Sequence, residues 1–287
     1  MSDYLRAKSL PEAVALLRGR DDLTILAGGT DIYPARATRN AWGNALQQRI
    51  LDISALDELR GIKDRGDHWW IGALTTWSDI VRAPLPPLFD GLQSAAREIG
   101  GVQIQNRGTI AGNICTASPA GDCIPCLLAL DAEVEIAGRA PRHINVGDFL
   151  TGYRTTCLWP DEMVTGIRVR KQAGRSAFRK LGARRYLVIS IAMVAALMDV
   201  DDTGKVRAAK FAVGACAATA QRLLALENAL LGHRLEPALV SPAHFAHLTE
   251  IDDIRASARY RRHAALQLTR DIIAEMVTQT SVGNSRD

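Results

Sequence analysis

The chain has 287 residues, 47% of them hydrophobic and 23% charged, which is typical of a globular protein with two domains or with one large domain and an appendage. Its 35 basic and 31 acidic residues give a formal net charge of +4 and are interspersed, and only 5% of the residues are aromatic, which argues against a nucleic-acid-binding surface. The most apolar run, 187–198, is far shorter than the roughly 20 residues that span a bilayer, which argues against a membrane span.

The first elements predict a small β–α–β unit. Residues 1–13 lack the apolar core of a signal peptide, so we expect a cytoplasmic protein. Ser9 with Glu12 is a capping-box pattern, which predicts a helix from residue 10 onward. A strand follows at 23–27, then a glycine turn with a helical or irregular stretch to Gln48, and then a strand at 49–53.

The next part of the chain alternates strands and helices up to about residue 170. The pattern predicts a strand at 68–73, a helix at 75–81 opened by a threonine, a stiff proline connector at 84–87, helices at 88–99 and 122–130, and strands at 132–136 and 163–169. A domain boundary is predicted near 171–176. We therefore expect a first domain at 1–173, with lobes of about 1–55 and 56–173.

Beyond this boundary the pattern predicts a second domain at 176–280. Strands at 188–200 and 206–215 flank a polar, glycine-containing turn, which indicates a β-hairpin. The remainder is typical of helices, and 256–277 carries apolar residues at i, i+4 spacing, a stripe that buries against a sheet. The fold class is therefore α+β.

Two glycine-containing loops are suited to bind an anion through backbone amides. Ala27–Asp31 directly follows a predicted strand, and Gly108–Asn113 (GTIAGN) lies between apolar segments. Glycine lets N–H groups approach a ligand closely, and the neighbouring hydroxyl and amide side chains can reach phosphate oxygens. One double glycine can be a plain turn, but two such loops in one domain suit a diphosphate. GTIAGN matches neither the Rossmann dinucleotide fingerprint nor the P-loop, so we expect neither a Rossmann NAD site nor ATP hydrolysis.

The cysteines predict reduced thiols. Five cysteines, an odd number, argue against a disulfide framework. Cys115, Cys123, Cys126 and Cys157 fall in one region, and Cys123 and Cys126 have metal-ligand spacing. The other two form no second close pair, so we interpret these residues as small buried hydrophobes.

Four segments are specific in their order and spacing: ILAGGTDI at 25–32, IGALTT at 71–76, QIQNRGTIAGNICTASPAGDCIPCLLALDA at 103–132 and FRKLGARR at 178–185. With them, essentially the whole chain resembles the FAD-binding medium subunit of the molybdenum hydroxylases, the family of xanthine dehydrogenase and carbon monoxide dehydrogenase. The resemblance implies a PCMH-type, vanillyl-alcohol-oxidase-like FAD domain of two α+β lobes with the cofactor between them. A small antiparallel sheet backed by helices follows, as in the C-terminal domain of the CO dehydrogenase flavoprotein.

The resemblance also implies cofactor-binding residues. Two loops wrap the FAD pyrophosphate in the family, and their positions match Ile25, Leu26, Ala27, Gly28, Gly29, Thr30, Asp31 and Ile32, and Thr109, Ile110, Ala111, Gly112 and Asn113. Ile99 and Val164 match positions that pack on FAD. Ala111 stands where glycine is common in the family, and its methyl group requires a backbone φ below zero.

Two charged residues match family positions as well. Asp122 matches an acid that contacts the cofactor, where its carboxylate would accept a hydrogen bond from ribose or adenine; alternatively, it caps the helix that follows. Lys180 matches a lysine near the flavin, where a cation would stabilise negative charge on the reduced ring; alternatively, it forms a surface ion pair. The chain lacks the long insertion that holds an extra iron–sulfur cluster in the 4-hydroxybenzoyl-CoA reductase branch, so we expect no cluster or metal here.

The implied function is that of the FAD-binding electron-transfer subunit of a molybdenum-containing dehydrogenase. The implied partners are a large molybdenum-cofactor subunit and a small [2Fe–2S] subunit, in a heterotrimer that is commonly duplicated. Electrons would pass from the [2Fe–2S] clusters through this chain to NAD, a quinone or oxygen, and no residue here would act as nucleophile or general base. A self-sufficient flavin oxidoreductase is the alternative, although the six histidines are scattered and indicate no acid–base pair. A third interpretation is a scaffold whose nucleotide site has decayed.

Overall fold

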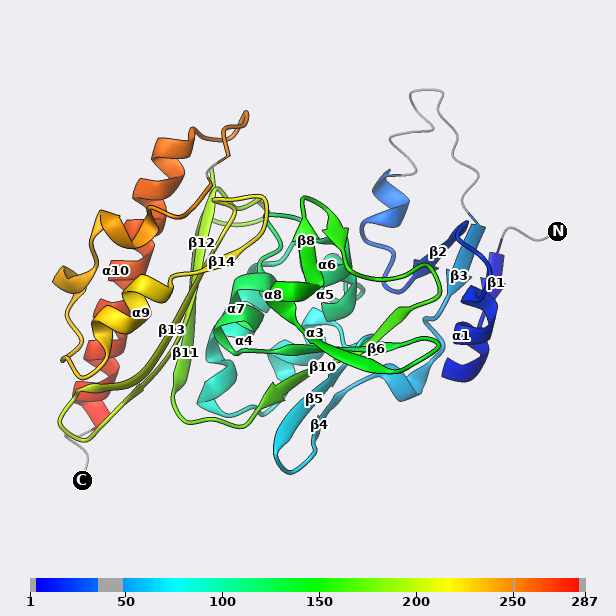
Figure 1. Cartoon of the computed structure of the whole chain (residues 1–287), viewed down its shortest axis with the longest axis horizontal. Helices are drawn as coiled ribbons and strands as arrows, with labels where there is room; N and C mark the ends of the chain where they lie inside the picture. Colours follow the sequence, from blue (N-terminus) through cyan, green and yellow to red (C-terminus); the bar gives the residue numbers. More distant parts are fainter. Residues whose placement is uncertain (1–3, 36–48, 250, 284–287) are drawn as a thin grey trace.

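The computed structural model describes residues 4–35, 49–249 and 251–283. Figure 1 shows a small first lobe at one end, a second lobe in the middle and a C-terminal sheet with its helices at the other end. In the part of the chain that is described, no helix is long and apolar enough to cross a bilayer.

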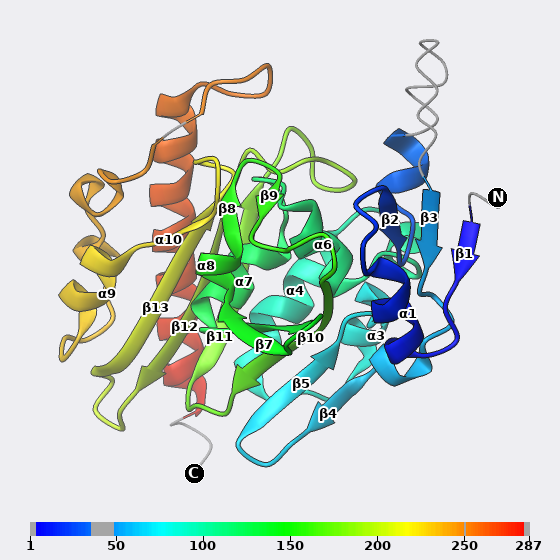
Figure 2. The same ribbon diagram turned by 45° about the vertical axis from the view of Figure 1, so that its right-hand side comes forward.

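The first lobe is a three-stranded parallel sheet of order β1-β3-β2. Its elements are β1 (Tyr4–Arg6), α1 (Leu10–Leu17), β2 (Leu23–Leu26) and β3 (Arg49–Asp52). Parallel neighbours need a crossover, which α1 provides beside the sheet (Figure 2). The helix α1 and the strands β2 and β3 lie where the sequence predicts them, whereas the stretch 36–48 falls outside the described residues.

The cap of α1 is only partly as predicted. Ser9 Oγ accepts a hydrogen bond from the Glu12 amide at 3.3 Å, which confirms Ser9 as the N-cap. The reciprocal bond is different, because Glu12 Oε2 accepts from the Lys8 amide at 2.8 Å instead of from the Ser9 amide. The cap therefore satisfies two backbone donors, as a capping box does, but the second donor is the amide of Lys8, one residue before the N-cap.

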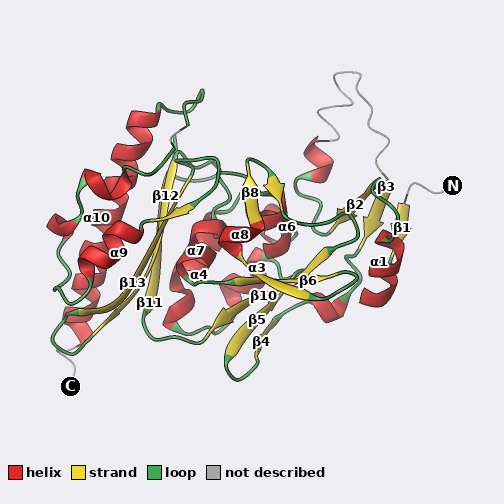
Figure 3. Cartoon of the chain, in the orientation of Figure 1, coloured by secondary structure: helices red, strands yellow, loops and turns green. Residues whose placement is uncertain are grey.

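The second lobe is built on a five-stranded antiparallel sheet of order β4-β5-β10-β6-β7. Its strands are β4 (Ile62–Asp64), β5 (His68–Gly72), β6 (Glu133–Ala137), β7 (Arg142–Asn145) and β10 (Met163–Arg170), with a small hairpin of β8 (Leu150–Gly152) and β9 (Thr155–Thr156) beside them. Ile71, Val134 and Ile167 on its inner face share one core with the helices of the lobe. Figure 3 shows these helices packed over one side of the sheet.

The helices of the second lobe are short. They are α3 (Trp77–Arg82), α4 (Asp90–Glu98), α5 (Val102–Gln105), α6 (Ile110–Thr116), α7 (Cys123–Ala129) and α8 (Val146–Phe149), with 3-10 turns at Asp57–Leu59 and Pro87–Phe89. The helix expected at 75–81 begins later because Thr76, and not Thr75, is its cap: Thr76 Oγ1 accepts from the Asp79 amide at 3.2 Å, and the Asp79 carboxylate accepts from the Thr76 amide at 3.0 Å.

The C-terminal region is a four-stranded antiparallel sheet of order β11-β12-β13-β14. Its elements are β11 (Arg175–Leu181), β12 (Ala192–Val200), β13 (Val206–Gly214), β14 (Gln221–Arg222), α9 (Leu224–Leu230) and α10 (Ala258–Gly283), with 3-10 turns at Pro237–Leu239 and Pro242–Phe245. The sheet lies between the second lobe and the layer of α9 and α10 (Figure 1).

The strand expected at 188–200 begins only at Ala192. The register of β11 ends with Leu181 opposite Ala192, so residues 182–191 form the connection between β11 and β12, which the bond from the Ile191 amide to the Leu181 carbonyl closes at 2.7 Å. Leu187 in this connection has a φ of +53°, and its side chain and that of Ile189 are exposed. The hydrophobic run therefore begins in a connecting segment and becomes a buried strand only at Ala192.

Candidate functional site

The two glycine loops, far apart in sequence, meet in space. A Cβ atom at Gly28 would lie 1.9 Å from the carbonyl oxygen of Arg107, so the backbones approach closely only because residue 28 is glycine. A side-chain bond joins the same two segments, since Thr116 Oγ1 donates to Asp31 Oδ2 at 2.7 Å. Both loops border one cavity of about 370 Å³, which we call the cradle cavity.

Most of the predicted site residues line this cavity. They are Ile25, Ala27, Gly28, Gly29, Thr30, Asp31, Ile32, Ile99, Thr109, Gly112 and Asn113. Ala111 and Val164 instead line an adjoining cavity of about 300 Å³, which we call the apolar cavity. Leu26 and Ile110 are buried in the protein core and line neither cavity.

Sequence reasoning missed several residues that also line the cradle cavity. They are Thr24, Trp77, Ile104, Cys115 and Thr116. Thr116 lies one helical turn after Gly112, so a prediction of helix for 110–116 would have placed it on the same face. No sequence pattern points to Trp77 or Ile104, which reach the cavity from α3 and α5 through tertiary packing.

The first loop offers open backbone donors. Gly29 has a φ of +75°, a left-handed conformation that glycine adopts without strain. Among the described residues, none accepts a hydrogen bond from the amides of Gly28, Gly29, Thr30 or Asp31. Buried or half-buried amides are normally paired, so a row of unpaired donors beside a cavity is suited to hold an anion.

The second loop is different from the expectation, because its glycine motif opens a helix. Thr109 is the N-cap of α6, and its Oγ1 accepts from the Gly112 amide at 3.1 Å. The Ile110 amide donates to the Thr75 carbonyl, which leaves the Ala111 amide without an acceptor in the described part of the chain. Ala111 lies within the helix and its φ is not positive, so the methyl group is tolerated there.

Asp122 and Lys180 line neither of these two cavities and bind one another. Lys180 Nζ donates to Asp122 Oδ2 at 2.6 Å, and Ser190 Oγ donates to Asp122 Oδ1 at 2.6 Å. The two charged side chains are only 5% and 7% exposed, so this is a buried pair and not the surface pair weighed above. Asp122 occupies the N-cap position of α7 but makes no capping bond, because its carboxylate oxygens point to these partners. Burial raises the pKa of Asp122, and Lys180 and Ser190 oppose that rise.

The other candidate groups are the cysteines and the histidines, and of these Cys115 lines both cavities. All five cysteines are free, and burial raises the pKa of Cys123 and Cys126 well above the usual range of a thiol. Cys123 Sγ donates to Asn113 Oδ1 at 3.0 Å, which fixes that amide beside the cradle cavity. Over residues 4–35, 49–249 and 251–283, no three histidine, cysteine, aspartate or glutamate residues lie together as a metal site. No histidine lines the cradle cavity or the apolar cavity.

Comparisons with known proteins agree with one another. The family model described as the FAD binding domain in molybdopterin dehydrogenase matches residues 1–171, and that described as the CO dehydrogenase flavoprotein C-terminal domain matches residues 176–276. The glyceraldehyde dehydrogenase medium chain of Sulfolobus acidocaldarius is 32% identical over 95% of this chain and 97% of its own. The nicotine 6-hydroxylase medium subunit of Paenarthrobacter nicotinovorans is 30% identical over 96% of this chain and 98% of its own. A solved carbon monoxide dehydrogenase from Hydrogenophaga pseudoflava, lacking the Mo-pyranopterin moiety of its cofactor, has a chain that superposes with a TM-score of 0.84 at 31% identity, covering 93% of this chain and 94% of that one.

Proposed function

The chain belongs to the family of FAD-binding medium subunits of molybdenum hydroxylases, and from this membership we propose that it holds the FAD diphosphate in the cradle cavity and relays electrons. The electrons would come from the [2Fe–2S] clusters of a small partner subunit and leave to NAD, a quinone or oxygen. A large molybdenum-cofactor subunit completes the proposed heterotrimer, which we expect to be duplicated and to act in the cytoplasm. FAD supplies the redox chemistry when bound, and the residues of this chain bind and orient it.

The close approach of Gly28 to Arg107 carries this proposal. It brings the open amides of residues 28–31 and the open amide of Ala111 to the border of connected cavities. A diphosphate carries negative charge and many acceptor oxygens, which such donors satisfy. Thr109 Oγ1 and the Gly112 amide are bonded to each other, so we assign these two groups to holding the start of α6 in place.

The remaining predicted residues have supporting roles in this proposal. Ile25, Ala27, Ile32, Ile99 and Val164 supply apolar walls, and Leu26 and Ile110 hold the loops from the core side. Asp122 and Lys180 would act on the cofactor as one ion pair, because each neutralises the other's charge. We also propose the division into an FAD domain at 1–173, with lobes of about 1–55 and 56–173, and a C-terminal domain at 176–280.

The self-sufficient oxidoreductase is not favoured. Direct chemistry on a small molecule needs an acid–base pair beside the flavin, and no histidine lines either cavity in the described ranges. The open donors of the first loop also argue against a decayed scaffold, because they remain arranged for a ligand. Activity of the isolated chain on an organic substrate would reverse this ranking.

Gly112→Asp tests the placement of the diphosphate. Gly112 is helical, and a Cβ there would lie 3.0 Å from Thr109 Oγ1, so the fold should survive with a small shift. The new carboxylate would repel the diphosphate from the cradle cavity. We expect wild-type protein to purify with FAD, identified after release by heat, and the variant to retain at most about a tenth of it, because each 1.4 kcal/mol of repulsion is tenfold in affinity.

Gly147→Asp is the matched control. Gly147 is exposed in α8, where a Cβ would meet only Leu128 Cδ2 at 3.6 Å, so we expect normal FAD content. Gly29 is a poorer test because its φ of +75° strains any substitution. Full FAD content in Gly112→Asp would overturn the diphosphate placement. Wild-type protein that neither contains FAD nor takes it up would overturn the function itself.

A further inference from the structure

Three cavities follow one another along the boundary between the two lobes. The cradle cavity and the apolar cavity share Ile25, Ala27, Gly112 and Cys115. The apolar cavity in turn shares Leu17, Trp159, Pro160 and Glu162 with an outer cavity of about 760 Å³. A ligand held at the cradle can therefore extend through the apolar cavity as far as Trp159.

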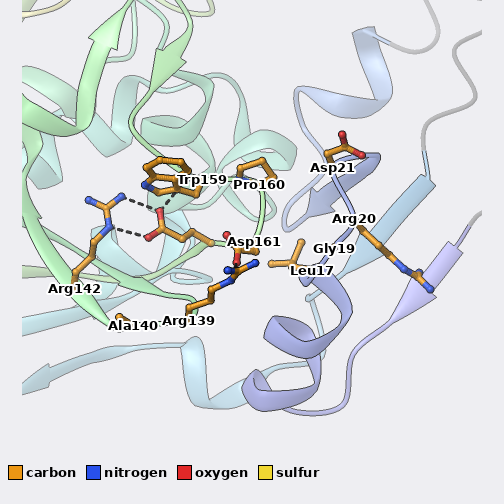
Figure 4. A pocket seen from close by; sticks show the side chains of 11 residues that line it. Leu17, Gly19, Arg20, Asp21, Arg139, Ala140, Arg142, Trp159, Pro160 and Asp161 are labelled. Carbon is orange, nitrogen blue, oxygen red and sulfur yellow. Dashed lines mark hydrogen bonds and ion pairs between the residues drawn. The ribbon is translucent and has the colours of Figure 1, made fainter.

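Trp159 stands where the apolar cavity meets the outer one. It is 68% exposed, although tryptophan has the largest apolar side chain. Figure 4 shows Trp159 beside Pro160 on one side of the outer cavity, with Leu17 and Asp21 of the first lobe on the other. An exposed indole at the mouth of an apolar cavity is placed to cover a flat ligand that enters from the cradle side.

The backbone below this ring is firmly held. The Trp159 amide donates to Glu162 Oε2 at 3.0 Å, and the Arg142 guanidinium binds both oxygens of the same carboxylate at 2.8 Å (Figure 4). Arg142 also donates to the Cys157 carbonyl at 3.1 Å. Bidentate arginine–carboxylate pairs fix geometry as well as adding energy, so the ring is presented from a rigid base.

The apolar cavity itself has the chemistry of a base-binding site. Its walls include Ile25, Ala111, Met163 and Val164, and the carboxylate of Glu162 at its edge is already paired with Arg142. A charged group would lose strongly favourable solvation there, whereas a flat, uncharged heteroaromatic ring loses much less. In FAD, the adenine is such a ring, and a ribose joins it to the diphosphate.

We propose that Trp159 closes the outer end of the apolar cavity by stacking on the adenine of FAD, and that this contact makes the site select the dinucleotide over FMN. The inference rests on the proposed FAD function, because it takes the diphosphate in the cradle as its starting point. Arg142 and Glu162 are positioning residues that hold the stacking ring.

The test compares FAD, FMN and AMP on flavin-free full-length protein. FMN lacks the adenine and AMP lacks the flavin. The Kd for FMN therefore measures binding at the flavin end of the site, and the Kd for AMP measures binding at the adenine end. Trp159→Ala should weaken FAD and AMP binding about tenfold or more, because loss of base–aromatic stacking has effects of that order, and should leave the Kd for FMN within about twofold. Trp159→Phe, which keeps a stacking face, should recover most of the FAD affinity.

Tyr153→Ala is the control, since Tyr153 is 65% exposed on the nearby β8–β9 hairpin but lines none of the three cavities. Equal FAD affinity in wild-type protein and Trp159→Ala would overturn the inference while leaving the FAD function intact. Equal losses of affinity for FAD and FMN in Trp159→Ala would also overturn it, because the Trp159 ring would then affect the fold or the binding of the phosphate groups and not the adenine. Failure of wild-type protein to bind any FAD would instead refute the proposed function.

Discussion

At the scale of single residues, Asp122 connects parts of the chain that are far apart in sequence. Asp122 directly precedes α7, and its carboxylate accepts hydrogen bonds from Lys180 of β11 and from Ser190 in the connection before β12. A buried carboxylate is stable only when it is paired and hydrogen-bonded, and both conditions are met here. The pair therefore joins the FAD domain to the C-terminal sheet and fixes the start and end of the connection 182–191.

Breaking this pair from one side should destabilise the fold. Lys180→Met leaves the Asp122 carboxylate buried with only Ser190, and Asp122→Asn leaves the Lys180 ammonium buried with the Val188 carbonyl at 3.4 Å. We expect each variant to lose about 3 kcal/mol of unfolding free energy, and the double variant to lose clearly less than the sum. Urea unfolding of the three proteins measures this coupling.

Arg179→Met is the control for that cycle. Arg179 neighbours Lys180 but pairs with Glu275 at the surface, where both side chains are more than a third exposed. Exposed pairs contribute about 1 kcal/mol or less, so this variant should be close to wild type. Additive losses in the Lys180 and Asp122 double variant would show that the two charges do not depend on each other.

The identity of these partners could not be predicted from sequence. Residues 122, 180 and 190 lie on three separate segments, and only the packing of α7 on the C-terminal sheet brings them together. The same is true of Gly28 and Arg107, whose backbone contact depends on how the two lobes meet. The motifs predicted which residue types bind a diphosphate, but tertiary structure decides which of their amides remain open.

At the scale of elements, the pattern of apolar residues predicted most strands and helices because many of them have one buried and one exposed face. The exceptions have physical reasons. In GTIAGN the glycine content suggested an open loop, yet the Thr109 cap compensates for the low helix propensity of glycine. In 188–200 the apolar run suggested one strand, but the register with the neighbouring strand β11 begins only at Ala192.

The start of α10 is held by an arginine that is almost completely buried. Arg261 is 1% exposed and donates to the carbonyls of Ile191 and Ala215, and it pairs with Asp253. Partial burial favours a higher pKa for Asp253, but hydrogen bonds from the Arg255 amide and the Arg261 side chain lower its pKa to about 2. The long helix is thereby fastened to one end of the antiparallel β12–β13 pair, where β12 begins and β13 ends.

The ion pair of Asp253 and Arg261 predicts that the folded state loses stability in acid. The pKa of Asp253 is lower in the folded than in the unfolded state, where it is about 3.9. Its stabilising effect is therefore complete above about pH 5 and is lost as the pH falls from there through 2. Asp253→Asn should reduce the unfolding free energy by on the order of 1–2 kcal/mol at pH 7 and flatten its decline between about pH 5 and 2. Urea unfolding at several pH values measures this change. The control is Asp202→Asn in the exposed β12–β13 turn, for which the unfolding free energy should depend on pH as it does in the wild-type protein.

At the scale of the whole molecule, the C-terminal sheet is buried on both faces. Met193, Ala195 and Leu197 of β12 belong to the core of the second lobe, whereas Ala192, Val194 and Ala196 belong to the core under α9 and α10. This explains why β12 is apolar at successive positions and does not alternate. The first lobe has a separate core, which includes only a few residues of the second lobe, such as Leu59, Leu74 and Met163.

Because the three cavities lie along the boundary between the lobes, bound FAD should act as a clamp between them. A ligand that binds only the folded state stabilises it by RT ln(1 + [L]/Kd), and here the contacts would fall on both sides of the boundary. Saturating FAD should therefore slow amide hydrogen exchange both in the first lobe, at α1 and residues 23–31, and at the start of α6. Exchange in α10, which lies beyond the C-terminal sheet, should be unchanged (Figure 1). Protection confined to α6 would mean that the ligand sits on the second lobe alone, and the first lobe would then have no part in holding the cofactor.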